Sequence, residues 1–353
     1  MSDVEISPKH HRFHISPGFI SIGAPVLGAL VGLSIGALLI LVTGSNPIDA
    51  YWVMFKGAFG GTRQITETLL KTTPILLIGL GMTVAFRARV WNIGGEGQYF
   101  MGALLGGLIA LYWTGLPQPL LWLVILLAGA LGGMLWALIP AVFKIRFGMS
   151  EIISTLMLNY IATLLMMYLT RGPLQEPGGV LPVSAKFASI TTLPVFPGTR
   201  VHLGVFLAFL LVPVIYVLLW KTPLGFRLRA VGSRASVAQY AGINVNRAIL
   251  TALLISGGLA GIAGITEVLM IHTRLKGTIS GGYGFSAILV ALLGRMNPFG
   301  VLLASIFFAA LIIGAETMHV LSGVPPELAD AIQAVIVLSV LAVHAWTRLK
   351  GEA

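Results

Sequence analysis

Long apolar stretches separated by short polar segments make up most of the chain. Nine of these stretches are long enough to cross a bilayer, which takes roughly 17–25 residues as an α-helix. They occupy residues 19–43, 68–86, 98–114, 119–142, 152–170, 203–220, 248–271, 299–318 and 326–346. They are too long for the strands of a membrane barrel, and backbone in lipid must satisfy its own hydrogen bonds. The pattern therefore predicts an all-α polytopic membrane protein.

A further apolar piece, residues 284–294, is too short to cross a bilayer upright. We expect it to form a half-helix or a re-entrant segment. Counting it gives about ten transmembrane segments, nine full and one half, with both termini on one side. The predicted organisation is an N-terminal tail (1–18), a transmembrane domain (19–346) and a C-terminal tail (347–353).

The composition supports this class and bears on the orientation. Hydrophobic residues make up 57% of the 353 positions and charged residues 10%, with a mean hydropathy of +0.94, whereas soluble domains carry about 25% charged residues. A net charge of +10 is typical of nucleic-acid binding, but most Lys and Arg residues lie in short loops on alternate sides. Cytoplasmic loops are enriched in these residues. We therefore predict cytoplasmic termini and no nucleic-acid partner, although Arg274 and Lys276 lie in a short loop assigned to the outside.

Several kinds of catalytic and cofactor site are excluded by the residues present. The chain has no cysteine, so disulfides, thiolate metal sites and a cysteine nucleophile are ruled out. No G-x-x-x-x-G-K-[ST], H-E-x-x-H or G-x-S-x-G motif occurs, and His10, His11 and His14 in the tail have no nearby carboxylate cluster. We predict no catalytic, cofactor-binding or metal-ligating residues, and no ATP hydrolysis by this chain.

Four ionisable residues lie within or beside the predicted spans: Lys71, Glu151, Glu267 and Glu316. Such groups are costly in a bilayer and often functional, so one interpretation is a relay for protons. The other is that they pair at helix interfaces or reach the membrane surface from helix ends. We favour pairing.

Two glycine-rich turns resemble each other along the chain. "IGGEGQYFMGALLGG" (93–107) aligns with "SGGYGFSAILVALLG" (280–294), and the charge-based topology places them at opposite ends of their helices. Matching elements of opposite orientation are typical of inverted-repeat transporters. Irregular backbone at membrane depth is tolerated where it lines a path or is buried in protein, so both turns are candidate gates, the alternative being tight interhelical turns. The candidate path or gate residues are Asn92, Gly94, Gly95, Glu96, Gly97, Gln98, Gly281, Gly282, Gly284 and Phe285.

Small residues recur at helical spacing in three of the predicted spans. They are Gly28, Gly32 and Gly36; Gly102 and Gly106; and Gly257, Gly258, Gly261 and Gly264. Such faces let helices approach closely inside lipid. We favour packing within the chain over dimerisation or a moving interface.

Two loops are candidate partner surfaces. Residues 221–247 form the most polar internal segment, in which Ser233 is expected to cap a short helix across 234–241 and Gly242 to end it. A short amphipathic helix of this kind suits the groove of another protein; a basic loop held at anionic lipid is the alternative. The long external loop 171–202 offers a surface to an external partner.

The stretch "LRAVGSRASVAQYAGINV" (228–245) resembles the cytoplasmic coupling loop of ABC-importer permeases of the branched-chain amino acid, ribose and nucleoside superfamily. It keeps most of the pattern R-A-V-G-x-N-P-x-A-A-x-Y-A-G-I and departs from it at Arg234, Ala235 and Val237. The resemblance implies that this loop receives the ATPase subunit. The residues assigned to that role are Gly225, Arg227, Arg229, Gly232, Ala238, Tyr240 and Gly242.

Two further motifs refine the resemblance. "WNIGGEGQ" resembles the N-I-G-x-E-G-Q motif of permeases that work with basic-membrane-protein (BMP) type binding lipoproteins and import nucleosides, and "GYGFSAILVALLGRMNPFG" (282–300) matches a superfamily stretch. The resemblance covers about residues 20–346. It implies a type II ABC importer-like bundle with inverted repeats in the bacterial inner membrane.

The same resemblance implies the partners and leaves two alternatives. The partners are a double-length ABC ATPase that binds ATP and Mg, a second related permease, a BMP-type lipoprotein and membrane lipid. The cargo is a nucleoside or a related purine or pyrimidine compound. One alternative is an ABC permease for a simple sugar of the ribose type; another is an ion-coupled secondary transporter using Glu267, Glu316 and Lys71.

Overall fold

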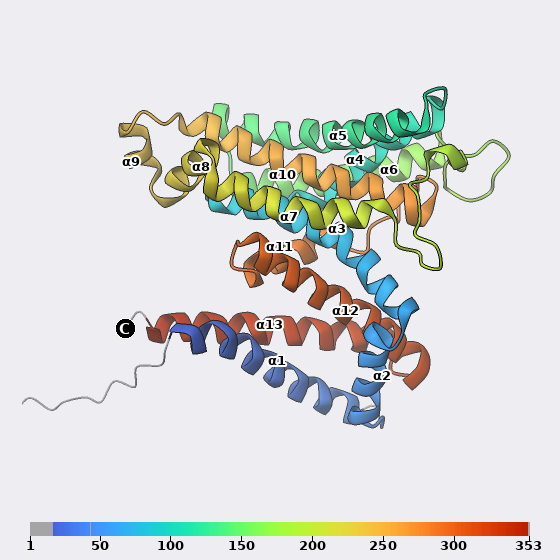
Figure 1. Ribbon diagram of the computed structural model, residues 1–353, viewed down its shortest axis with the longest axis vertical. Coiled ribbons are helices and arrows are strands. Elements are labelled where there is room, and N and C mark those ends of the chain that lie inside the picture. Colours follow the sequence, from blue (N-terminus) through green and yellow to red (C-terminus); the bar gives the residue numbers. More distant parts are fainter. Residues whose placement is uncertain (1–16, 43, 352–353) are drawn as a thin grey trace, which may run out of the picture. The chain divides into compact units, whose positions relative to one another are not determined.

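The computed structural model describes residues 17–42 and 44–351. The predicted N-terminal tail, with its three histidines, lies outside the described residues except for positions 17–18, as do positions 352–353 of the C-terminal tail. The described chain is helical (Figure 1). Its α-helices are α1 (Pro17–Val42), α2 (Pro47–Phe59), α3 (Thr62–Arg87), α4 (Gly95–Tyr112), α5 (Gln118–Phe147), α6 (Glu151–Arg171), α7 (Leu203–Lys221), α8 (Pro223–Ser233), α9 (Ala235–Tyr240), α10 (Val245–Glu267), α11 (Tyr283–Leu293), α12 (Pro298–Ser322) and α13 (Pro326–Gly351).

The helices confirm a polytopic membrane protein. Within the described residues, 6 helices are long and apolar enough to cross a bilayer, namely α3, α5, α6, α7, α10 with its following π-helical turn (Val268–His272), and α12. The bent pair α1–α2, with an angle of 118°, counts as one more. The short piece predicted at 284–294 corresponds to α11. The count of about ten segments stays a prediction.

Helix α2 is an element that the hydrophobic pattern did not predict. It has only 13 residues and carries Asp49 and Lys56, so it is too short and too polar to stand out as a span. Its later part presents the exposed aromatic rings of Trp52, Phe55 and Phe59, with Lys56 over the Trp52 ring.

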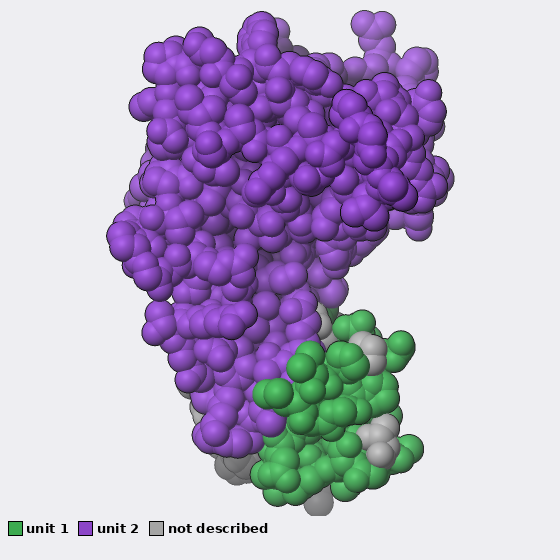
Figure 2. Space-filling model, turned by 90° about the vertical axis from the view of Figure 1, so that its right-hand side faces the viewer, with its two compact units in different colours: residues 1–51, 318–353 green, residues 52–317 purple. Residues whose placement is uncertain are grey.

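The chain divides into two compact units (Figure 2). One contains residues 1–51 and 318–353, the other residues 52–317. In the first unit α1 packs on α13: a Cβ added at Gly28 or Gly32 would overlap the backbone of Val340 or Ile336. These glycines thus serve packing within the chain, as predicted.

The core of the second unit is α3. Its residues from Thr72 to Phe86 are all buried, including the aliphatic run Ile75–Ile78. A helix that is apolar and enclosed on every side occupies the centre of a bundle. Helices α7, α10 and α11 contact it.

Beside this core, α4, α5 and α10 pack with their backbones in direct contact (Figure 1). A Cβ at Gly102 would overlap the backbone of Gly261, and one at Gly133 would overlap the carbonyl of Gly257. A Cβ at Gly264 would likewise overlap the carbonyl of Tyr99. The glycine faces of the third predicted span and of 248–271 therefore bring helices of one chain together.

The segment between α6 and α7 is held by backbone pairs and ion pairs. Isolated antiparallel bridges join Gln175 to Ser184 and Val183 to Lys276. The Arg274 guanidinium lies 2.5 Å from the Glu176 carboxylate. The loop 171–202 thus has a defined course against the turn that follows α10.

Candidate transport path and coupling segment

The first glycine turn is fixed by a buried network of side-chain amides. The Asn92 amide donates to the Gln98 carbonyl oxygen (2.9 Å) and to the Ser256 hydroxyl (2.8 Å), and the Gln98 amide donates back to Asn92 (3.0 Å). The backbone N–H of Gly94 also donates to Asn92, at 3.0 Å. Asn92 is fully buried and Gln98 is 1% exposed, so the turn has little freedom to move independently of α10.

Helix α6 supports the same turn from another side. Asn159 accepts from the backbone N–H of Gly97 (2.8 Å) and donates to the carbonyl of Ile93 (2.9 Å), while Thr155 accepts from the N–H of Ile93. Ser256, Thr155 and Asn159 were missed from the sequence. The only signal for them was a polar residue inside an apolar span, which most often marks a backbone hydrogen bond.

The two glycine turns contact each other. Glu96 lies in the first turn of α4, is 7% exposed, and accepts a hydrogen bond of 2.8 Å from the backbone N–H of Gly284 in the first turn of α11. A Cβ at Gly284 would overlap the backbone of Glu96. Gly282, the residue before α11, has φ +82°, which favours glycine. The carboxylate thus meets the positive end of the α11 dipole, and it fixes one turn to the other.

The predicted path residues are therefore only partly brought together. Asn92, Glu96, Gln98 and Gly284 form one buried cluster with Gly94, Gly95 and Gly97. Gly281 and Phe285 are exposed and lie outside this cluster.

The ionisable residues of the spans have polar or charged partners, which agrees with the favoured interpretation in its pairing form. Lys71 lies 3.8 Å from the Glu316 carboxylate and donates to the Tyr283 hydroxyl at 3.0 Å. The Tyr283 hydroxyl donates in turn to Glu267 at 3.4 Å. Glu151 lies 2.5 Å from Lys144.

The predicted coupling loop, residues 221–247, folds as two helices rather than one. Its part from the N-cap Thr222 onward, residues 222–247, is called the coupling segment below. Helix α8 begins after Thr222, whose hydroxyl accepts from the N–H of Gly225 (3.1 Å), and it ends at Ser233. The prediction that Ser233 caps a helix across 234–241 is wrong, because Arg234 holds the N-cap position of α9. The turn after α9 was predicted correctly: Gly242 has φ +80°.

Two of the predicted coupling residues, Gly225 and Gly232, allow α8 to pack closely against α7 and α3. A Cβ at Gly225 would overlap the carbonyls of Leu218 and Leu219 in α7, and one at Gly232 would overlap the carbonyl of Arg87 at the end of α3. Arg229 is half-buried near Arg87. Helix α8 is thereby joined to the central helix of the unit.

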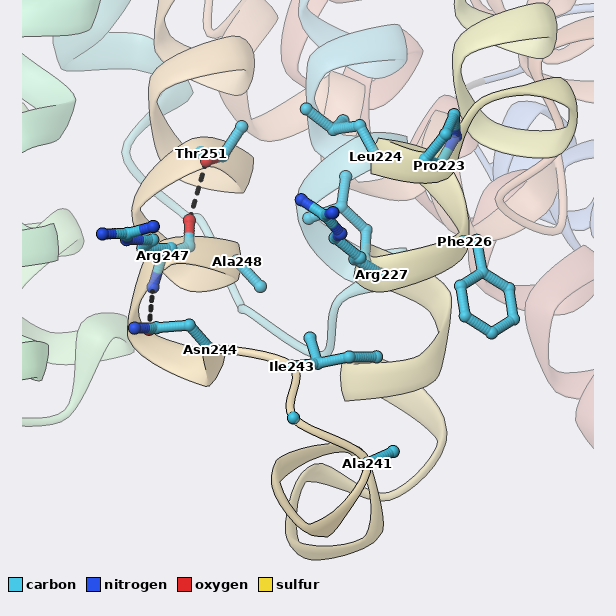
Figure 3. A pocket seen from close by; sticks show the side chains of 12 residues that line it. Pro223, Leu224, Phe226, Arg227, Ala241, Ile243, Asn244, Arg247, Ala248 and Thr251 are labelled. Atoms are coloured by element: carbon cyan, nitrogen blue, oxygen red, sulfur yellow. Dashed lines mark hydrogen bonds between the residues drawn. The ribbon is translucent and has the colours of Figure 1, made fainter.

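The remaining predicted coupling residues present a surface. Tyr240 is 94% exposed, whereas Ala238 is 4% exposed and anchors α9. Between α8 and the start of α10 lies a cavity of about 580 Å³, lined by Pro223, Arg227, Gly242, Asn244 and Arg247 among others (Figure 3). Asn244 caps α10 by accepting from the N–H of Arg247 at 2.9 Å. Arg227 extends from α8 toward this gap (Figure 3).

These features define a polytopic helical membrane protein: apolar helices packed backbone to backbone, two interlocked glycine turns, and a polar two-helix segment that contacts the central helix. The chain belongs to the family described as branched-chain amino acid transport system / permease component, which matches residues 64–341. It is a permease subunit of an ABC transporter, and it is a multi-pass membrane protein.

Individual relatives resemble nearly the whole chain. A guanosine ABC transporter permease of Bacillus subtilis is 37% identical over 93% of this chain and 95% of its own length. A glucose ABC transporter permease of Haloferax volcanii is 35% identical over 95% and 90%, and a nucleoside ABC transporter permease of Lactococcus lactis is 29% identical over 89% and 88%. No solved structure matches the chain.

Proposed function

We propose that the chain forms the translocation path of a nucleoside importer. The observation that carries this proposal is the turn 92–98, whose sequence resembles the motif of nucleoside-importing permeases and which is built here as one buried unit with Glu96 bound to Gly284. The relatives named for guanosine and nucleosides support the same cargo. Membership of the permease family favours an ABC mechanism over an ion-coupled one.

Coupling to ATP runs through the segment 222–247 in this proposal. A separate ATPase subunit, double in length, binds ATP and Mg and seats against Tyr240 and the cavity between α8 and α10. The arginines at this cavity suit acidic groups of that partner. Because Gly232 holds α8 directly against the end of α3, a displacement of α8 moves the central helix. The permease contributes two packing arrangements, and the partner supplies the free energy.

The remaining parts of the proposal concern assembly and orientation. Both termini are cytoplasmic in the bacterial inner membrane, the chain crosses about ten times with the two glycine turns as parts of inverted repeats, and a second related permease completes the path. A BMP-type lipoprotein delivers cargo to the loop 171–202. This chain itself has no catalytic role.

Uptake by the assembled importer tests the cargo. Proteoliposomes containing both permeases and the ATPase, with ATP inside and the lipoprotein and radiolabelled guanosine outside, should accumulate guanosine. Omission of the ATPase should abolish the accumulation. Guanosine entry driven by a proton or sodium gradient without the ATPase would contradict the proposal.

A simple sugar is the second candidate cargo, and the relative named for glucose favours it. Calorimetric titration of the lipoprotein with guanosine, ribose and glucose separates the candidates. We expect guanosine to bind most tightly. Binding of glucose alone, together with glucose uptake by the same proteoliposomes, would replace the nucleoside assignment.

A further inference from the structure

A small polar cavity lies beside the interlocked turns, within the unit of residues 52–317. It has a volume of about 260 Å³ and is lined on α3 by Lys71, on α10 and its π-helical turn by Glu267 and His272, and along the following turn by Thr278, Ser280 and Tyr283. Ser280 also accepts from the backbone N–H groups of Gly282 and Tyr283 and interacts with the Glu96 carboxylate. The cavity thus adjoins the residues that join the two glycine turns.

The wall of this cavity carries a continuous chain of polar groups. The Lys71 ammonium donates to the Tyr283 hydroxyl, which donates to Glu267, at 3.0 and 3.4 Å. Glu267 is 7% exposed, and an ionised carboxylate can accept about four hydrogen bonds. The bond from Tyr283 therefore leaves Glu267 with acceptor capacity toward the cavity. Lys71 likewise has three donors.

From this geometry we infer that the cavity is a subsite for the sugar ring of the cargo, which recognises two neighbouring hydroxyl groups. This inference rests on the proposed function. A buried carboxylate accepts from both hydroxyls of a vicinal pair, and the adjacent ammonium donates to one of their oxygens. Such charge-assisted bonds are about twice as strong as neutral ones, and intramembrane ionisable groups mark substrate paths.

The size of the cavity fits one ring rather than a whole nucleoside. Pockets for drug-sized ligands measure roughly 300–1,000 Å³, and this cavity falls below that range. The base of a nucleoside then lies outside it. Ribose in guanosine and the ring of glucose both carry neighbouring hydroxyls, so one subsite serves the cargo named for either kind of relative.

Two other ligand classes fit the cavity less well. Among the residues that the structure describes, the lining holds one ammonium, that of Lys71, which already donates to Tyr283 and lies near Glu316. With the Glu267 carboxylate beside it, the cavity offers a phosphate no excess of positive charge, which disfavours nucleotides. Throughout the described residues, no group of three or more His, Cys, Asp or Glu side chains could hold a metal ion. An uncharged polyhydroxyl ring is the ligand that the donors and acceptors match.

The absence of cysteine from the chain provides a direct test. Thr278→Cys places a single thiol at the cavity, and Val180→Cys, at a position 96% exposed in the loop between α6 and α7, is the matched control. The full chain in lipid nanodiscs is labelled with a maleimide in the presence of uridine or 2′,3′-dideoxyuridine. The second compound differs only in lacking the neighbouring 2′- and 3′-hydroxyls, and it keeps the 5′-hydroxyl.

We expect uridine at twice its dissociation constant to slow labelling of Thr278→Cys about threefold, as occupancy requires. Dideoxyuridine should not slow it, and neither compound should affect Val180→Cys. Adding Glu267→Gln to the Thr278→Cys chain should abolish the protection. The double variant should still elute as a single monodisperse species in size-exclusion chromatography, which shows that it is folded. If that double variant does not fold, the comparison of the two nucleosides on Thr278→Cys alone still decides the matter.

Equal protection by both nucleosides, or protection by neither, would overturn the subsite. Guanosine uptake by the assembled importer is measured separately. Normal uptake with no protection would reject the subsite and leave the proposed function intact. Protection by uridine without any nucleoside uptake would instead reject the proposed function and leave a sugar-ring site in a permease for another polyhydroxyl cargo.

Discussion

The interlocked glycine turns and the coupling segment 222–247 both depend on glycine, but for opposite reasons. At Gly284 a side chain is excluded because the backbone of Glu96 occupies its place, and the polar groups around the turn are buried and bonded. At Gly242 the surrounding space is open, and glycine is required by φ +80°. The first region is an internal joint, and the second is a surface shaped for a partner.

This difference predicts how each region fails when it is changed. Substitutions in the joint should destabilise the protein and stop transport together. Substitutions on the coupling surface should stop transport while the protein stays folded. Each of the following substitutions tests whether stability and transport are lost together or transport is lost alone.

The largest effect is expected from Gly284→Ala. The new Cβ overlaps the Glu96 backbone, and forcing extra volume into a packed site costs about 1–3 kcal/mol. We expect a clear fall in the melting temperature of the detergent-solubilised protein and loss of most guanosine uptake. Gly115→Ala, which meets open space between α4 and α5, is the control and should behave like the unaltered chain. If the two variants had the same melting temperature and the same uptake, the close contact between Gly284 and Glu96 would not be needed for stability or transport.

Glu96→Ala should have the next largest effect. It removes the acceptor for the Gly284 N–H, and a hydrogen bond to a charged group contributes about 1.5–3 kcal/mol. Glu96→Gln keeps an acceptor oxygen at the same place and should lose less stability than Glu96→Ala in thermal unfolding. The reverse order would mean that the Glu96 carboxylate does not hold the turn.

Tyr240→Ala should leave the melting temperature unchanged, because the side chain is 94% exposed. Exposed substitutions away from special features stay within about ±0.5 kcal/mol. Transport-coupled ATP hydrolysis of the assembled importer should nevertheless fall by about thirtyfold, since interface hot spots cost about 2 kcal/mol or more when truncated. Wild-type coupling in this variant would exclude α9 from the ATPase contact.

The smallest effect is expected from Gly242→Ala. A left-handed conformation costs an alanine about 1–2 kcal/mol, confined here to the end of α9. Coupled ATPase activity should drop a few-fold, and Gly242→Asn should retain more of it because asparagine tolerates φ > 0. A large loss of thermal stability in Gly242→Ala would place this turn in the core.

Sequence patterns predicted the long helices because an apolar run of sufficient length has few other solutions in a bilayer. They also located both glycine turns and the end of α9. Helix α8 was missed although Thr222 and Pro223 are good signals for a helix start, because Gly225 and Gly232 lower its helix propensity. Those glycines serve contacts with α7 and α3 that only the folded chain reveals.

The joint itself could not be read from the sequence. Glu96 and Gly284 are 188 positions apart, and nothing local indicates that they meet. The supporting Asn159 and Ser256 lie in helices whose apolar pattern conceals their role. The sequence predicted that Lys71 has a partner, because an unpaired charge is costly inside a bilayer. It did not predict that the partner is Glu316.

Site-specific cross-linking tests most directly that the segment 222–247 receives the ATPase. Tyr240→Cys, the only thiol in this chain, is labelled with a benzophenone maleimide in the assembled importer and irradiated. The account predicts a covalent adduct with the ATPase subunit from position 240 and none from Val180→Cys. An adduct from position 180 together with none from position 240 would contradict it.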